Sequence, residues 1–356
     1  MPAAYHPRPV PFAGLSGAYW KRMTAKPLPP GDLDDILAHT AGVFRSLRGA
    51  HIFITGGTGF FGHWLLESLL HANRYLGAGI AATVLTRNAA VFREKSPHIT
   101  GDPAITVLEG DIQHFAFPAG QHTHIIHAAT DTVTADAPAL AASITDGTQR
   151  VLEFAQTTGA RRLLYTSSGA IYGRGITDVA RIAETHPCAP AAPDSYDHAK
   201  RVAEQFCLDA PIEAVIARCF AFVGPHLPLD HHFAIGNFIR DALTGKPIHI
   251  KGDGTPLRSF LYMSDLAIWL WTMLATAPAG RAYNVGSNES VSIAELARTV
   301  ATTLNPGLPI RIDGTPIPGI RPATYVPDIA RAQTELGLSV TIPLPEAIRK
   351  TAAWYT

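Results

Sequence analysis

Tyr196 and Lys200 lie four residues apart in the run Tyr196-Asp-His-Ala-Lys200. In a helix this spacing places the two side chains on the same face, one turn apart. A phenol has a pKa of about 10 and is therefore a poor acid–base catalyst near neutral pH. A neighbouring ammonium group favours the phenolate, and lowering the pKa from about 10 to about 7 requires about 4 kcal/mol. The pair predicts a phenol that exchanges a proton with a substrate oxygen.

A serine-rich segment, Tyr165-Thr-Ser-Ser-Gly-Ala-Ile-Tyr-Gly173, lies upstream and begins within a predicted strand. In α/β sheets, ligands bind at the carboxyl ends of the strands. We therefore expect Ser168 to hydrogen-bond the reacting carbonyl or hydroxyl oxygen. The Tyr–Lys spacing occurs by chance in many helices, but its position after this segment and after a glycine-rich turn makes the combination specific.

That glycine-rich turn is Thr55-Gly56-Gly57-Thr58-Gly59-Phe60-Phe61-Gly62, between a predicted strand and a predicted helix. Glycines at these spacings permit a tight turn, close approach of the backbone to a pyrophosphate, and close helix–strand packing. The helix N-terminus then offers unpaired N–H groups to the phosphates. The pattern predicts a dinucleotide site, with these candidate contacts: Gly56, Thr58, Gly59, Phe60, Phe61 and Gly62.

The end of the second predicted strand, Leu85-Thr-Arg-Asn88, indicates which dinucleotide is bound. An acidic residue there would hydrogen-bond the adenosine ribose of NAD, and none is present. Arg87 is suited to pair with a 2′-phosphate, so NADP(H) is the favoured cofactor and NAD(H) the alternative. The other interpretation of Arg87 is an arginine that is solvated at the surface. Four further candidate cofactor contacts follow the third and fourth strands: Asp111, Ile112, Ala128 and Ala129. Tyr196 and Lys200 are also candidate cofactor contacts: Lys200 is suited to hold the nicotinamide ribose, and an oxidised nicotinamide would help its ammonium group to favour the phenolate.

Strands and helices alternate from about residue 50. Short apolar runs predict strands at 51–55, 81–85, 105–108, 124–127 and 162–166, and helical spacing predicts helices at 64–72 and 137–157. Parallel strands need such crossover helices, so we expect an α/β fold with a Rossmann-type, doubly wound parallel sheet. Proline and glycine punctuate the chain after about residue 224, which is typical of a smaller substrate-binding lobe.

The predicted organisation has three parts: an N-terminal extension (1–48), a dinucleotide-binding domain (49–223, with contributions from about 260–286), and a lobe (224–356). Within the extension, Asp32 is a candidate cap for a short helix. Leu33, Ile36, Leu37 and Val43 would share one face of that helix. The helix either packs over the main domain or contacts a partner.

Composition excludes several classes of protein. Hydrophobic residues make up 47% and charged residues 16% of 356 residues, so the chain can bury a large core. The 29 basic and 29 acidic residues balance, which argues against nucleic-acid binding. The sequence shows neither an apolar run long enough to span a membrane nor a signal-peptide pattern. Its three cysteines form no C-x-x-C pair and are odd in number, which favours a reducing, cytoplasmic location. His226, His231 and His232 lack further ligands at metal-site spacing, so we expect no metal.

Taken together, the glycine turn, the serine-rich strand end and the Tyr–Lys pair make the chain resemble an extended short-chain dehydrogenase/reductase of the nucleotide-sugar epimerase/dehydratase group. The resemblance runs from about His51 to Tyr355. It implies a Ser168–Tyr196–Lys200 triad and a C-terminal lobe that binds a nucleoside-diphosphate sugar. It also implies substrate contacts at Asn237, Arg258 and Arg321, although the spacing around Arg321 departs from the family pattern.

The resemblance also bears on the reaction. The group's 4,6-dehydratases carry an Asp-Glu pair directly after the catalytic Ser or Thr, and its sugar-acid decarboxylases usually carry a Glu at the second position. Gly169 and Ala170 stand there in this chain, so dehydration and decarboxylation are disfavoured unless another loop supplies a carboxylate, such as Glu184 or Asp194.

Two reactions need only the triad. Arg87 favours NADPH-dependent reduction of a nucleoside-diphosphate 4-keto-6-deoxyhexose at C4, and the alternative is an NAD-dependent 4-epimerase. A cofactor-binding sensor without catalysis is a further alternative, which the intact triad argues against. The family resemblance also implies a homodimer formed by the helices at about 137–157 and 195–208.

Overall fold

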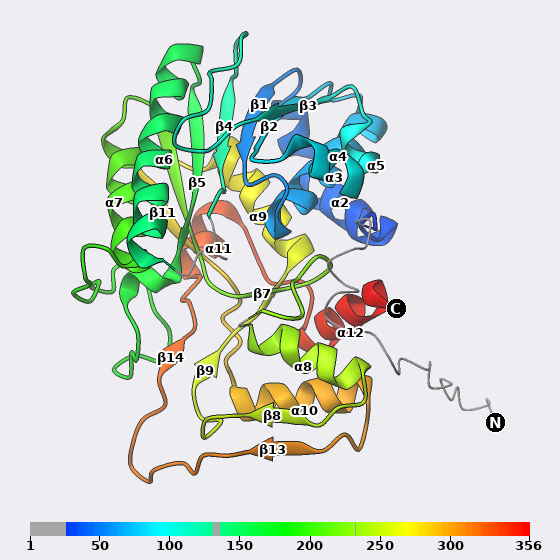
Figure 1. Cartoon of the computed structure of the whole chain (residues 1–356), viewed down its shortest axis with the longest axis vertical. Helices are drawn as coiled ribbons and strands as arrows, with labels where there is room; N and C mark the ends of the chain where they lie inside the picture. The colour runs from blue at the N-terminus through cyan, green and yellow to red at the C-terminus, as the bar shows by residue number, and fades with distance from the viewer. Residues whose placement is uncertain (1–25, 131–135, 232) are drawn as a thin grey trace, which may run out of the picture.

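A computed structural model describes residues 26–130, 136–231 and 233–356 of the chain (Figure 1). The predicted N-terminal extension is thus described only from Lys26 onward, and His232 lies outside the described residues. None of the helices in the described ranges has the length and apolar character that crossing a membrane requires.

The centre of the molecule is a seven-stranded sheet in which every neighbouring pair is parallel, in the order β11-β6-β5-β4-β1-β2-β3. This is the predicted Rossmann-type sheet. The strand order reverses between β1 and β4, and such a switch point opens a crevice at the carboxyl ends of the strands. The strands are β1 His51–Thr55, β2 Ala81–Thr86, β3 Ile105–Glu109, β4 His124–His127, β5 Arg162–Ser168, β6 Glu213–Cys219 and β11 Arg281–Val285.

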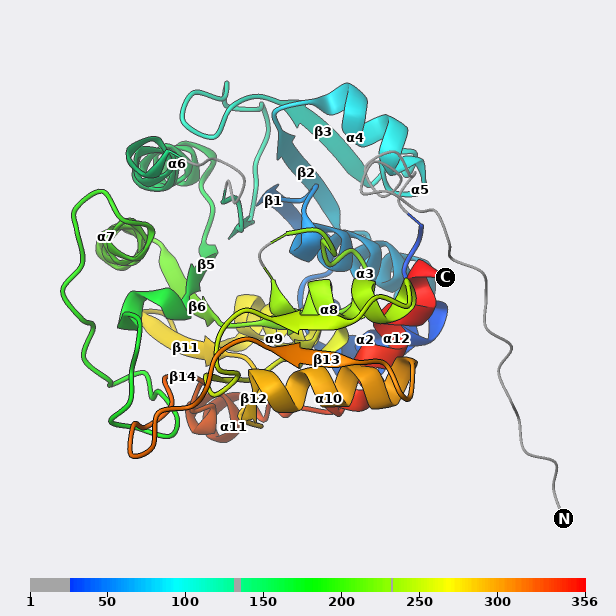
Figure 2. The ribbon, with the colours of Figure 1, turned by 60° about the horizontal axis from the view of Figure 1, so that its bottom comes forward.

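Helices cover both faces of the sheet (Figure 2). Alternate strand residues point to opposite faces, so Ile52 and Ile54 join one apolar core and Phe53 joins the other. One face carries α3 (Phe60–Leu76), α9 (Met263–Thr276) and α2 (Pro30–Ser46), and the other carries α6 (Ala137–Thr158) and α7 (Tyr196–Asp209). Two short helices, α4 (Ala89–Lys95) and α5 (Pro97–Thr100), lie beside β3.

Helix α2 packs against α3 and α9, so the described part of the extension is a layer of the main domain. Asp32 does not cap this helix, because Pro30 already occupies its first position. The Asp32 carboxylate is instead fully buried, where it pairs with Lys350 at 2.5 Å and accepts a hydrogen bond from the Tyr262 hydroxyl at 2.7 Å. The extension is thereby bound to the C-terminal helix.

A second lobe, built mainly from residues after β6, lies below the carboxyl edge of the sheet (Figure 1). Its elements are short, whereas α9 and β11 return to the main domain. Helices α8 and α10 pack together beside the β8–β13 pair. The remaining elements are η1 Gly169–Tyr172, β7 Phe222–Val223, α8 Ala234–Leu243, β8 Ile248–Ile250, β9 Leu257–Arg258, β10 Leu261–Tyr262, β12 Val291–Ser292, α10 Ile293–Leu304, β13 Ile310–Ile312, β14 Thr324–Tyr325, α11 Ala330–Leu336 and α12 Leu344–Tyr355.

Candidate active site

A cavity of about 1390 Å³ is lined both by the carboxyl edge of the sheet and by residues of the second lobe. It brings together the glycine turn after β1, the serine-rich end of β5 and the start of α7. Nearly all the residues that the sequence singled out line this one cavity: Gly56, Thr58, Gly59, Phe60, Phe61, Arg87, Asp111, Ile112, Ala128, Ala129, Ser168, Tyr196, Lys200 and Arg258.

The glycine turn has the shape that a dinucleotide requires. Gly56 has a φ of 74°, and a Cβ there would lie 2.5 Å from the carbonyl oxygen of Ala128. At Gly62 a Cβ would lie 2.2 Å from the backbone of Gly57, so α3 can pack on the turn only without a side chain. At Gly59, by contrast, the nearest atom would be 3.4 Å from a Cβ, and the space in front of this residue is part of the cavity.

Helix α3 begins at this turn and presents its N-terminus to the cavity. Its first residues, Phe60 and Phe61, line the cavity. No side chain caps the helix, and its first turn has no acidic residue. The unpaired N–H groups and the positive end of the helix dipole therefore suit a pyrophosphate. The residues present fit a dinucleotide, which Gly59 and the first turn of α3 would hold.

A buried hydrogen-bond network supports the opposite wall. The Thr55 hydroxyl accepts hydrogen bonds from the N–H groups of Ala128 and Ala129, both at 3.1 Å, and so donates its own hydrogen to Nδ1 of His127 at 2.8 Å. Nε2 of His127 lies 3.0 Å from the Thr148 hydroxyl, which donates elsewhere and therefore accepts here. His127 is thus held as the neutral tautomer that carries hydrogen on Nε2.

This network predicts a dependence of stability on pH. Burial, reinforced by the charge of Lys200, lowers the pKa of His127 to about 3. Neutral His127 contributes to the free energy of unfolding. The contribution is present in full above pH about 6.5, the pKa of an unfolded histidine, and is lost as the pH falls toward 3. At pH 5 the free energy of unfolding is lower by about 2 kcal/mol for this reason.

Urea unfolding at pH 7.5 and at pH 5 measures this contribution. The free energy of unfolding should fall by about 2 kcal/mol more in the natural protein than in His127→Gln, which cannot take up the proton. An equal fall in the two proteins would show that His127 does not contribute to the pH dependence.

The adenosine end of the cavity lies beyond β2 and β3. Arg87 and Asp111 are exposed there, and Ile112 is half-buried against α6 at Gly147. The carboxylate of Asp111 accepts the N–H of Gln113 at 2.9 Å. Their contacts with a cofactor stay predictions.

The predicted triad lies at the C-terminal end of β5 and in the N-terminal part of α7. Ser168 is the last residue of β5, and its hydroxyl accepts the N–H of Ala170 at 3.1 Å. Tyr196 begins α7, and Lys200 follows one turn later with its Nζ 5.9 Å from the centre of the Tyr196 ring. Lys200 Nζ also donates to the carbonyl oxygen of Thr166 at 2.9 Å. The structure therefore brings the three side chains together.

Burial has the largest effect on the acidity of the phenol. Burial raises the pKa of Tyr196, and a hydrogen bond with Ser168 partly offsets that rise. Lys200 does not reverse it, because this ammonium group is itself fully buried and bound to Thr166, and burial lowers its own pKa to about 8. The lysine therefore does not by itself offset the effect of burial on the pKa of Tyr196.

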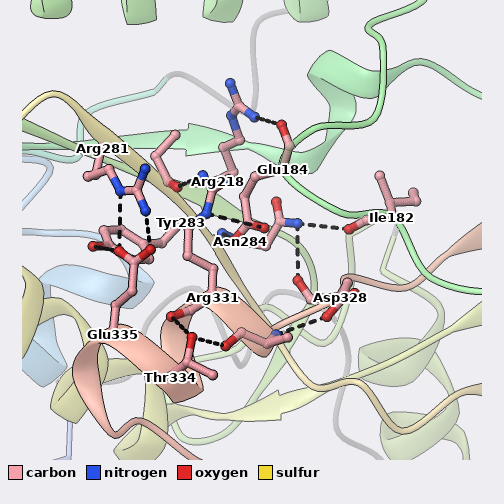
Figure 3. Close-up of polar contacts among 12 residues, drawn as sticks. Ile182, Glu184, Arg218, Arg281, Tyr283, Asn284, Asp328, Arg331, Thr334 and Glu335 are labelled. Carbon is pink, nitrogen blue, oxygen red and sulfur yellow. Dashed lines mark hydrogen bonds and ion pairs between the residues drawn. The ribbon is translucent and has the colours of Figure 1, made fainter.

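A polar network holds α7 against β6 beneath the triad. Arg218 on β6 pairs with Glu204 on α7 at 2.8 Å and donates to the Tyr172 hydroxyl at 2.9 Å. Tyr172 donates to the side chain of Asn284 at 2.8 Å. The N–H of Asn284 donates to Glu184 at 2.9 Å (Figure 3). Glu184 is therefore held inside this network and does not line the cavity. Sequence reasoning did not find Arg218 and Glu204, which share no motif.

Of the three predicted substrate contacts other than Ser168, one lines the cavity and two do not. Arg258 lines the cavity, and no carboxylate in the described ranges lies within ion-pairing distance of it. Asn237 and Arg321 do not line the cavity. The Asn237 amide donates to the carbonyl oxygen of His231 at 2.8 Å, and Arg321 is exposed in the loop before β14. Their predicted roles are not supported by this arrangement and stay predictions.

Sequence reasoning also missed Tyr325, which lines the cavity from the second lobe. It belongs to a two-residue strand, and such a strand has no periodicity that a sequence pattern could reveal. Only the pairing of distant segments places it near Ser168.

Comparisons with known proteins agree with this geometry. A model of the NAD dependent epimerase/dehydratase family matches residues 52–286. The chain is 28% identical over 313 residues to UDP-glucuronic acid decarboxylase 1 of Arabidopsis thaliana. The matched residues cover 83% of this chain and 68% of the relative.

Two solved structures show the same fold. The Bordetella bronchiseptica enzyme WbmG, solved in complex with NAD, is 26% identical with a TM-score of 0.69, over 86% of this chain and 93% of that one. A UDP-N-acetylglucosamine 4-epimerase from Methanobrevibacter ruminantium M1, in complex with UDP-N-acetylmuramic acid, has a TM-score of 0.73 at 18% identity, over 86% and 98% of the two chains.

Proposed function

Because the chain belongs to the NAD-dependent epimerase/dehydratase family, we propose that it transfers hydride at C4 of a nucleoside-diphosphate sugar, as a 4-epimerase. One observation carries this proposal: the glycine turn lines the same cavity as Ser168, Tyr196 and Lys200. The comparisons support a nucleotide-sugar enzyme of this family that uses NAD.

The side chains of the cavity have distinct roles. Tyr196 takes the proton of the C4 hydroxyl during oxidation and returns a proton to the oxygen during reduction. Ser168 hydrogen-bonds the same oxygen, and Lys200 orients the cofactor and adds positive charge. A bound nicotinamide would supply the acceptor and donor of the hydride and, when oxidised, a positive charge. The half-buried Arg258 guanidinium, which has no carboxylate partner among the described residues, is suited to the diphosphate.

The described part of the cavity lacks a suitably placed acid, which argues against loss of water or carbon dioxide. Gly169 and Ala170 have no proton-transferring group, and Glu184 is held by Asn284 outside the cavity. Among the described residues that line the cavity, the carboxylates are Asp111, at the adenosine end, and Asp230, which pairs with His231. We therefore infer that the sugar keeps all its carbon and oxygen atoms.

Product analysis tests the epimerase proposal. The purified protein would be incubated with UDP-glucose, UDP-N-acetylglucosamine and UDP-glucuronic acid, and the dinucleotide that co-purifies would be identified. We expect bound NAD and, with one of these sugars, a C4 epimer without net consumption of a cofactor. Release of carbon dioxide or water, or no conversion of any of the three, would contradict the proposal.

Arg87 favours a second candidate, the NADPH-dependent reduction of a nucleotide 4-keto-6-deoxyhexose. It lines the cavity at the end of β2, where an acidic residue would select NAD. If it binds a 2′-phosphate, Arg87→Ala should weaken NADPH binding about tenfold to 100-fold and leave NADH binding nearly unchanged. Fluorescence titration with both cofactors measures this difference, and equal effects on the two would remove the support for the reductase.

Assembly and location are proposals of the same kind. Helices α6 and α7 pack side by side on one face of the sheet, as a homodimer through these helices requires. A cytoplasmic homodimer remains our expectation for the assembled enzyme.

A further inference from the structure

His63 lies in the first turn of α3, directly after the glycine turn. Its ring Nδ1 lies 2.9 Å from the carbonyl oxygen of Gly59, and its backbone N–H donates to the same oxygen at 3.2 Å. A carbonyl oxygen can only accept hydrogen bonds, so Nδ1 carries a hydrogen. The Gly59 carbonyl therefore accepts two hydrogen bonds from one residue.

The other ring nitrogen of His63 is also satisfied. Nε2 lies 3.0 Å from the hydroxyl oxygen of Ser96, the residue that precedes α5. Burial lowers the pKa of His63, so the ring is neutral at neutral pH and Nε2 has a lone pair for the Ser96 hydrogen. The His63 ring therefore cannot turn over without losing both hydrogen bonds.

The second lobe packs on this ring. His226, in the loop between β7 and α8, stacks on His63 with the ring centres 4.0 Å apart and the planes 18° apart. On its own other contact, His226 packs on Trp354 of α12 at 4.5 Å. Among the non-glycine residues of the described ranges, His226 alone has a positive φ, 69°, and such a conformation persists where the surrounding contacts enforce it. The loop thus keeps a strained backbone that lays the His226 ring on His63.

The contact with Gly59 affects the cofactor side of the helix. Gly59 and Phe60 share one peptide group, whose carbonyl and N–H point in opposite directions. Because the Gly59 carbonyl points along α3 to His63, the Phe60 N–H points out of the helix, toward the cavity that Phe60 lines. This N–H is one of the unpaired first-turn donors that suit a pyrophosphate, so whatever fixes the carbonyl also fixes the donor.

We propose that His63 is a positioning residue of the dinucleotide site: its Nδ1–H holds the Gly59 carbonyl so that the Phe60 N–H points at a phosphate, and the His226 ring keeps His63 in that position. The second lobe thereby acts on the cofactor site through a stacked pair of histidines. This inference rests on the proposed function only for the cofactor site, and it holds whichever reaction the enzyme performs.

Two amide variants separate the two hydrogen bonds of His63. In His63→Asn the side-chain NH₂ takes the place of Nδ1 and can donate to Gly59, whereas in His63→Gln the amide extends to the place of Nε2, beside Ser96. Calorimetry with ADP-ribose, after removal of any NAD that co-purifies, measures the effect. We expect the dissociation constant to rise about threefold to tenfold in His63→Gln and less than about twofold in His63→Asn. Equal losses in the two variants, or no loss in His63→Gln, would overturn the inference.

A second ligand and a second histidine are the controls. Adenosine has no phosphate, so its dissociation constant, measured by NMR titration, should be the same in the natural protein and in His63→Gln. Nε2 of His98 lies 3.3 Å from Glu67 of α3, outside the cavity, so His98→Gln should leave ADP-ribose binding unchanged. An equal loss for adenosine, or an equal loss in His98→Gln, would show a general disturbance of α3 and would overturn the inference.

A double-mutant cycle tests the contribution of the second lobe. His226→Ala removes the stacked ring and should weaken ADP-ribose binding by at least about twofold in the natural background. When His63→Gln is already present, the same change should have a smaller effect, because no donor to Gly59 remains to be held. An equal effect in both backgrounds would contradict a role for His226 through His63.

A further measurement needs neither ligand nor turnover. In protein labelled with ¹⁵N-histidine, the ring-nitrogen signals show which nitrogen carries the hydrogen, and His63→Asn assigns the signal. The inference predicts that Nδ1 of His63 carries it at neutral pH, and hydrogen on Nε2 instead would overturn it. If the natural protein binds ADP-ribose but converts no nucleotide sugar, the proposed function fails, while these measurements still decide the role of His63.

Discussion

Replacing Tyr196 with phenylalanine is expected to lower kcat by about 10³-fold, the size of effect typical for loss of a general acid–base group. The ring would remain at the start of α7, so the cavity wall and the position of Lys200 should be kept. What is lost is the oxygen that exchanges the C4 proton. Initial rates with the nucleotide sugar that the natural enzyme converts measure this effect.

Cofactor binding separates this loss from a general defect. The glycine cradle and the first turn of α3 do not contact the Tyr196 hydroxyl in the described structure, so the dissociation constant of NAD should change less than about threefold. Turnover within about tenfold of the natural enzyme would mean that another group performs the proton transfer.

Glu204→Gln is expected to lower the free energy of unfolding by about 3 kcal/mol or more. The side chains of Arg218 and Glu204 are only 15% and 7% exposed, and they are joined at 2.8 Å. Glutamine keeps the volume but leaves the Arg218 charge buried without its counter-ion. Because this pair fastens α7 to β6, kcat should also fall as Tyr196 and Lys200 lose their fixed position. Urea unfolding at neutral pH measures the change in stability.

The chain offers a matched exposed pair. Arg281 and Glu335 also join a strand to a helix, but their side chains are 45% and 28% exposed. Glu335→Gln should therefore cost no more than about 1 kcal/mol. A similar loss in the two variants would show that burial of the Arg218–Glu204 pair is not what makes it important.

The fold could be predicted from the sequence because its signals are local. The run His51–Thr55 is apolar throughout, as expected for a strand covered on both faces, and the structure has a strand with those bounds. The glycine turn, the end of β5 and the Tyr196–Lys200 spacing are likewise contiguous in sequence. Their meeting in one cavity then follows from the rule that parallel strands place their carboxyl ends at the same edge.

The features that were not predicted depend on contacts between distant segments. Asp32 looked like a helix cap, because nothing in its neighbourhood shows that Lys350 and Tyr262 enclose it. The depth at which Tyr196 and Lys200 are buried could not be predicted for a related reason: the sequence shows that the two residues are neighbours but not what covers them. Tyr325 reaches the cavity only through the pairing of Thr324 with Ile176, in the loop after η1.

A single-turnover experiment with a nucleotide sugar deuterated at C4 tests the central claim most directly. The NAD-loaded enzyme would be mixed with deuterated UDP-glucose, UDP-N-acetylglucosamine or UDP-glucuronic acid, and the nicotinamide would then be examined by mass spectrometry. Hydride transfer at C4 predicts that deuterium appears on the reduced nicotinamide with the natural enzyme and not with Tyr196→Phe. Product that forms while the nicotinamide carries no deuterium at any time of sampling would contradict the account.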